Sequence, residues 1–227
     1  MTNTIKTVSI SKLHVYESCP YRAKLAWVDK IPDVQPRKAA DRGTAIHQLA
    51  EDYVRGEIAN LPPELKHFAS EFTALKQLYG EGKVSLEGEW GFNESWEPTN
   101  YKTAWLRVKA DAVVFLSDSH AVVVDHKTGK RYGNEFKHSQ QLQLYALATL
   151  LRNPKLSKVD TELWYLDQDD LAHMPITQKS ISKYLKFFDK EFKRLSNDTE
   201  FKPTPNIISC KWCPYHPSKQ GDCKYGV

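Results

Sequence analysis

Long apolar segments are missing from this 227-residue sequence. No stretch is long and apolar enough to cross a bilayer. The first residues, MTNTIKTVSI, lack the apolar run of a secretory signal peptide. The sequence therefore predicts a soluble protein of the cytoplasm, either of a cell or of the host of a virus, with no membrane partner.

Phosphate-binding loops and internal repeats are also missing. No GxxxxGK[ST] segment occurs, so the chain itself has no sign of a nucleotide-driven motor. Neither sign of charge dominates, since 32 Lys and Arg stand against 28 Asp and Glu, for a net charge of +4. This mildly basic balance is compatible with a nucleic-acid partner but does not require one.

Cysteine is scarce and unevenly placed. The four residues are Cys19, Cys210, Cys213 and Cys223. Because intracellular thiols stay reduced, disulfides are not expected, and three cysteines close to the end of the sequence favour a metal instead. Cys19 would complete a four-thiolate site, for zinc or an iron–sulfur cluster, if the two ends meet. His216 keeps a Cys₃His zinc site open as an alternative.

The apolar periodicity predicts an α/β fold. Helical spacing and β-type runs alternate in a way that predicts a mixed central sheet flanked by helices. We expect one domain over 1–227, with a core at about 38–166 and with 9–30 and 200–227 forming the cysteine site. The expected helices are 9–30, 37–57, 62–80, 135–152 and 177–196, and the expected strands are 86–92, 104–116, 120–127 and 159–166.

Two acids and a lysine occupy expected strands. Asp111 lies within VKADAVVF, and Asp125 and Lys127 end VVVDHKTGK. Side chains at i and i+2 of a strand share a face. Two neighbouring carboxylates raise each other's pKa unless a cation lies between them, and Mg²⁺ or Mn²⁺ prefers such oxygen ligands. The carbonyl of His126 could add an oxygen, and Lys127 could position a water or stabilise phosphate charge. A plain surface ion pair is the alternative.

Other polar residues have helical or strand spacing relative to this set. His47 and Glu51 share a helix face, as do Gln141 and Tyr145. Structural roles for His47 and Tyr145 are the alternative. Glu89, on the strand before Asp111, is either a further active-site acid or part of a cross-strand salt bridge.

Four segments, GTAIH, KADAVVF, VVVDHKTGK and QLQLY, occur in an order that resembles the RecB-like branch of the PD-(D/E)XK nuclease superfamily. The resemblance implies a restriction-endonuclease-like core. It also implies metal binding by His47, Asp111 and Asp125, catalysis by Lys127, and support from Gln141 and Tyr145 beside the DNA.

The cysteine-containing segments SISKLHVYESCPYRAKL and CKWCPYHPSKQGDC resemble those of AddB-type and CRISPR-associated exonucleases. That resemblance implies a structural [4Fe-4S] cluster on Cys19, Cys210, Cys213 and Cys223. It further implies a Mg²⁺- or Mn²⁺-dependent exonuclease that acts on DNA ends or single strands in recombination, repair or phage DNA processing, beside a separate helicase or recombination protein. An endonuclease or flap nuclease, and a non-catalytic DNA-binding or assembly module, are the alternatives.

Basic residues give a weaker indication of the DNA path. One side of the helix expected at 177–196 is basic, which is also what an ordinary solvated helix face looks like. Three further basic residues lie close in sequence to the expected metal site. The candidate DNA contacts are Arg42, Lys130 and Arg131 near that site and Lys183, Lys186 and Lys190 on the helix.

Overall fold

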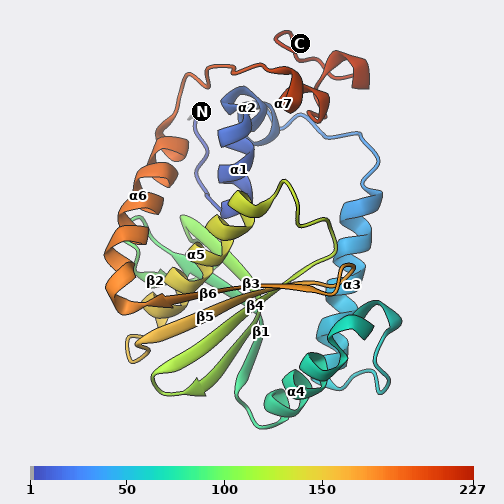
Figure 1. The fold of residues 1–227 in the computed structure, drawn as a ribbon. Coiled ribbons are helices and arrows are strands. Elements are labelled where there is room, and N and C mark those ends of the chain that lie inside the picture. Colours follow the sequence, from blue (N-terminus) through green and yellow to red (C-terminus); the bar gives the residue numbers. More distant parts are fainter. Residues whose placement is uncertain (1–2) are drawn as a thin grey trace. The chain divides into compact units, whose positions relative to one another are not determined.

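A computed structural model describes residues 3–227, which divide into two compact units. One unit is Lys38–Lys186 and contains the β-sheet; the other joins the residues up to Arg37 with Phe187–Val227. Figure 1 shows the elements of both. Among the described residues, no helix is both long and apolar enough to cross a membrane.

The sheet has six strands in the order β2-β1-β3-β4-β5-β6. Neighbouring strands are antiparallel except β4 and β5, which are parallel. A parallel pair needs a crossover, and the helix α5 (Glu135–Arg152) provides it. The expected α/β fold with a mixed sheet is therefore confirmed. The strands are β1 Val84–Phe92, β2 Pro98–Thr99, β3 Leu106–Ser117, β4 His120–Lys127, β5 Lys158–Tyr165 and β6 Asp170–Thr177.

Helices cover both faces of the sheet. On one face, α3 (Lys38–Arg55), the 3₁₀ helix η1 (Pro63–Phe68) and α4 (Ala69–Gly80) bury their apolar sides against Val124 and Trp164. On the other face, Leu142 of α5 packs with Leu163 and Tyr165. Because side chains alternate along a strand, β4 presents Val124 to one helical layer and its neighbour Asp125 to the other.

The second unit is built from short helices near both ends of the chain. The single helix expected at 9–30 is two helices, because Cys19 is extended at φ −168° and Pro20 begins the next helix. Proline has no N–H to donate to the preceding turn, so it can start a helix but not continue one. The helices are α1 Ile10–Ser18, α2 Pro20–Trp27, α7 Ile207–Lys211 and η3 Pro217–Lys219, with α6 Ile181–Asn197, preceded by η2 Gln178–Ser180, entering from the first unit.

Two strands were not expected from the sequence, β2 and β6. The β6 segment DLAHMPIT contains Pro175, which argues against a central strand. The structure places β6 at the edge of the sheet, where a missing N–H can face away from the partner strand.

Candidate active site

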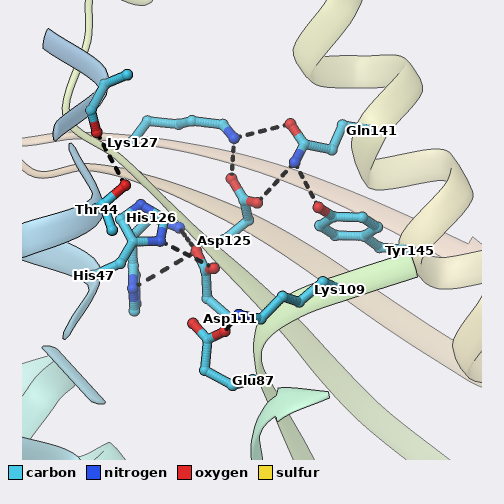
Figure 2. Close-up of polar contacts among 11 residues, drawn as sticks. Thr44, His47, Glu87, Lys109, Asp111, Asp125, His126, Lys127, Gln141 and Tyr145 are labelled. Carbon is cyan, nitrogen blue, oxygen red and sulfur yellow. Dashed lines mark hydrogen bonds and ion pairs between the residues drawn. The ribbon is translucent and has the colours of Figure 1, made fainter. Parts of the chain in front are cut away.

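The site lies where two strands separate. Backbone pairing of β3 with β4 reaches Ala112↔Val124 and stops there, so the next two facing residues are Asp111 and Asp125. On its other side, β4 stays paired with β5 as far as Lys127↔Tyr165. The Asp111 carboxylate accepts a hydrogen bond from the His126 backbone N–H at 2.7 Å, which links the strands beyond their last backbone pair. The two acids expected from the sequence are thus presented at one opening in the sheet (Figure 2).

Asp125, Lys127, Gln141 and Tyr145 form one polar chain. The Lys127 ammonium lies 2.6 Å from Asp125 Oδ2 and donates to Gln141 Oε1 at 2.8 Å. The Gln141 amide nitrogen donates to Asp125 Oδ1 at 3.0 Å and to the Tyr145 hydroxyl at 2.7 Å. Asp125 is only 2% exposed. A single residue of α5 therefore contacts both the acid and the base of β4.

The pKa values of the two acids are moved in opposite directions. Burial raises the pKa of Asp125, Lys127 opposes that rise, and the Asp111 charge adds to it. Burial would also raise the pKa of Asp111, but hydrogen bonds from His47 and His126 lower it below its usual range. A buried acid that resists losing its proton beside a charged one is an arrangement that a bound cation would stabilise.

His47 joins the site from α3. Its Nδ1 lies 3.1 Å from Asp111 Oδ1. Burial disfavours the imidazolium, but the hydrogen bond and charge of Asp111 outweigh burial and raise the pKa of His47. In the same helix, a Cβ on Gly43 would come within 3.2 Å of Thr128 Oγ1, so glycine lets α3 approach the segment that follows β4.

Glu87 is a site residue that the sequence reasoning missed. Its carboxylate and ligand atoms of His47 and Asp111 all lie within 4.8 Å of one another. The three side chains line a cavity of about 370 Å³. Glu87 has a φ of 49°, a conformation that residues other than glycine rarely adopt, and it forms an ion pair with Lys109. Glu89, the acid expected here, is exposed.

The reason for this difference is the strand register. Pairs such as Leu86↔Ala112 and Gly88↔Ala110 place Glu87 directly opposite Asp111. Glu87 and Glu89 are two residues apart on β1, so the alternation of side chains along a strand places both on the same face of the sheet. Only the register of 84–92 against 106–114 separates them, and no signal in the local sequence gives that register.

The imidazole of His126 is a second unexpected contributor. Only the carbonyl of His126 was expected to act, but its ring is 4% exposed and lies beside the rings of His47, Phe72 and Trp164. Burial lowers its pKa to about 4, despite the nearby Asp111 carboxylate. The ring is therefore neutral at pH 7, and its Nδ1 lies 3.8 Å from Asp111 Oδ2.

Three predicted site residues are engaged in ion pairs. Arg42 forms two 2.8 Å hydrogen bonds with Asp167, and Arg131 contacts both oxygens of Asp170. Glu51 lines the cavity but is bound by an arginine one helical turn later. The remaining predicted DNA contacts are exposed lysines: Lys130 after β4, and Lys183, Lys186 and Lys190 on α6.

All four cysteines lie in the unit formed by the chain ends, and all four line one pocket of about 20 Å³. Cys210 and Cys213 are buried, and Cys19 and Cys223 are partly buried. Burial raises the pKa of Cys213, and the nearby Cys223 and Cys19 add to the rise. Among the described residues, no three metal-binding atoms of these cysteines lie within 4.8 Å of one another. His216, the alternative ligand, donates to or accepts from Ser218 at 2.7 Å.

One protein family and one phage protein are similar in sequence to this chain. The model of a family described as the PD-(D/E)XK nuclease superfamily matches residues 7–218. The Gene 69 protein of Mycobacterium phage D29 is 22% identical over 255 residues, which cover 90% of this chain and 93% of that protein.

Two solved structures are similar at low identity. The crystal structure of SSO0001 is 17% identical, with a TM-score of 0.45 over 100% of this chain and 90% of that one. A putative exonuclease from Eubacterium rectale is 12% identical, with a TM-score of 0.47 over 87% of this chain and 84% of that one. Both TM-scores lie below 0.5, so the family assignment depends on the family model.

Proposed function

The chain belongs to the PD-(D/E)XK nuclease superfamily, and we propose that it is a Mg²⁺- or Mn²⁺-dependent deoxyribonuclease of the RecB-like branch. We further propose that it is an exonuclease that hydrolyses phosphodiesters at DNA ends or in single strands. The observation that carries the proposal is the placement of Asp111, Asp125 and Lys127 at the opening between β3 and β4. The phage origin of one relative supports a role in phage DNA recombination or processing.

The residues present fit a hard divalent cation. Asp111 and Asp125 supply carboxylate oxygens, His47 an imidazole nitrogen and His126 a backbone carbonyl, which are ligand types that Mg²⁺ and Mn²⁺ accept. The opposed pKa shifts of the two acids support the fit, because burial raises the pKa of Asp125 even though the Lys127 ammonium lies 2.6 Å from its carboxylate. A bound ion would polarise the phosphate and lower the pKa of a water.

Glu87 belongs to the same proposed site as an additional carboxylate. It faces Asp111 across β1 and β3 and shares the cavity with His47. Its ion pair with Lys109 holds the carboxylate at this position. Glu87 would therefore add negative charge to the metal site from a strand that the sequence motifs do not include.

Lys127, Gln141 and Tyr145 are proposed to act on the water and the phosphate rather than to bind the metal. The Lys127 ammonium is held between Asp125 and Gln141, so its charge is fixed beside the metal-binding carboxylates. From there it can orient a water or stabilise negative charge that develops on a phosphate. Gln141 is a positioning residue, because its amide contacts Lys127, Asp125 and Tyr145 at once. Tyr145 in turn fixes the orientation of that amide.

We also propose that Cys19, Cys210, Cys213 and Cys223 bind a structural [4Fe-4S] cluster. The shared pocket supports a common ligand. Four thiolates can bind either zinc or an iron–sulfur cluster, and the resemblance of the two cysteine-containing segments favours the cluster. The family match spans both units, which supports one nuclease domain over 1–227.

The test is cleavage of DNA labelled separately at each end, as single strand and duplex, with Mg²⁺, with Mn²⁺ and with EDTA. Wild type is compared with Lys127→Ala and with Lys155→Ala, an exposed lysine of the same unit. We expect metal-dependent cleavage in wild type and Lys155→Ala and its loss in Lys127→Ala. The label lost first gives the polarity.

Three results would contradict the proposal or one of its parts. Absence of cleavage by wild-type protein with either metal, on every substrate, would favour a non-catalytic DNA-binding module. Equal cleavage by Lys127→Ala and wild type would mean that another group has the role assigned to Lys127. Internal cuts in circular DNA would replace the exonuclease assignment with an endonuclease.

A further inference from the structure

Two aromatic side chains stand out on the sheet-containing unit because they are exposed. Tyr132 is 79% exposed and Phe136 71%. Every other Phe, Tyr and Trp of Lys38–Lys186 is buried or partly buried. A single exposed apolar side chain needs no explanation. Two that are four positions apart, in a unit that otherwise covers its aromatic rings, indicate a surface that binds another molecule.

Both residues lie close in sequence to the candidate active site. The segment 128–134 leads directly from Lys127 to α5, and Tyr132 is within it. Phe136 is in the first turn of α5, five residues before Gln141, whose amide holds Lys127. Five residues advance a helix by about 7.5 Å and rotate it by about 140°, so Phe136 lies between one and two turns before Gln141 and on a different side of α5.

The backbone on both sides of Tyr132 is anchored. Arg131 donates to both oxygens of Asp170 at 2.8 and 2.9 Å, and its backbone N–H donates to Gln168 at 2.9 Å. The N–H of Gly133, at φ +85°, donates to Glu135 Oε2 at 2.8 Å. The rings are thus presented by an ordered segment, so little conformational entropy is lost when they bind a partner.

The charge around the rings favours a polyanion. Lys130 and Lys137 are exposed on either side of them, and neither forms an ion pair with any described residue. The acid in the segment, Glu135, is already bound by the Gly133 N–H. Exposed aromatic rings between free lysines are the combination with which proteins bind single-stranded nucleic acid: rings stack on bases and cations contact phosphates.

We propose that Tyr132 and Phe136 stack against unpaired bases and give the enzyme its preference for single-stranded or frayed DNA next to the scissile phosphate. The inference rests on the proposed nuclease function and specifies its substrate. In duplex DNA the faces of internal bases are already covered by their neighbours, so only unpaired bases can use these rings. Every base has such a face, so the preference is for strand form rather than for sequence.

The experiment measures DNA binding by fluorescence anisotropy in Mn²⁺, with every protein carrying Lys127→Ala so that the DNA stays intact. The added changes are Tyr132→Ala with Phe136→Ala, the ring-preserving pair Tyr132→Phe with Phe136→Tyr, and Leu116→Ala as a control. Leu116 is 49% exposed and lies five residues beyond Asp111 on β3, about 17 Å away. The probes are a single strand, the same strand with abasic sites, and a duplex.

The double alanine variant is expected to bind the single strand about tenfold or more weakly, since each stacked base contributes substantially to affinity. Its affinity for abasic DNA and for duplex, and its melting temperature, should match those of its parent. The ring-preserving pair and Leu116→Ala should bind within about twofold of the parent.

Equal losses on normal and abasic strands would overturn the inference, because contacts to phosphate and not to bases would then be responsible. Unchanged binding by the double alanine variant would also overturn it and would leave the rings for a protein partner. If either result is obtained and the enzyme with Lys127 intact still cuts DNA, the nuclease proposal is retained and only the stacking proposal is overturned. An enzyme that neither binds nor cuts DNA would overturn both.

Discussion

Replacement of Gln141 by leucine tests the active-site geometry most selectively. Leucine has a similar volume but no amide, so Lys127 loses an acceptor at 2.8 Å and Asp125 a donor at 3.0 Å. A hydrogen bond to a charged group contributes about 1.5–3 kcal/mol. If one such bond acts only in the transition state, its loss lowers kcat by roughly 10- to 150-fold. KM should change little, because Gln141 is not proposed to contact substrate.

The assay is single-turnover hydrolysis of end-labelled DNA. Gln143→Leu is the matched control, since Gln143 is on the same helix but donates to Ser139 at 3.1 Å. Tyr145→Phe should lose less than Gln141→Leu, because it removes only one neutral partner of the amide. The reasoning is refuted if Gln141→Leu keeps the wild-type rate, or if Gln143→Leu loses as much.

Three further predictions concern the metal site, the cysteine site and acid stability. Glu87→Gln should weaken Mn²⁺ binding about tenfold or more by calorimetry without DNA, whereas Glu89→Gln should not; equal affinities would remove Glu87 from the site. Protein purified without oxygen should be brown with about four iron atoms per chain, and Cys213→Ser should lose colour and iron together; a colourless protein that contains zinc would contradict the cluster. Burial raises the pKa of Asp198, but backbone N–H donors and the Tyr16 hydroxyl at 2.7 Å outweigh it and lower that pKa. Because the folded pKa is lowered, this stabilisation is present above about pH 5 and lost as pH falls below about 4. Asp198→Asn should therefore cost about 1 kcal/mol in urea denaturation at pH 7 and less as the pH falls through the lowered pKa of Asp198. A cost that does not change with pH would refute the role of the ionised carboxylate.

The central elements could be predicted from local sequence because their signals are local. The valines of 122–124 and the apolar spacing of 135–152 identify β4 and α5 without knowledge of their neighbours. Since Asp125 and Lys127 are on one strand, and Gln141 and Tyr145 on one helix, spacing alone placed each pair on a common face.

Features that depend on long-range pairing could not be predicted in the same way. Whether Glu87 or Glu89 faces Asp111 depends on the register of β1 against β3. The ion pairs of Arg42 with Asp167 and of Arg131 with Asp170 could not be predicted, because the partners are distant in sequence. The edge strand β6 was missed for a related reason: Pro175 argues against a strand until its place in the sheet is known.

The most direct test of the central claim measures Mn²⁺ binding and DNA hydrolysis together in Asp111→Asn. Asp118→Asn is the control, because Asp118 is exposed in the turn between β3 and β4. Asp111→Asn is expected to lose both metal binding and cleavage, while Asp118→Asn should keep both. Metal-dependent cleavage that survives in Asp111→Asn would contradict the assignment of this site as the nuclease centre.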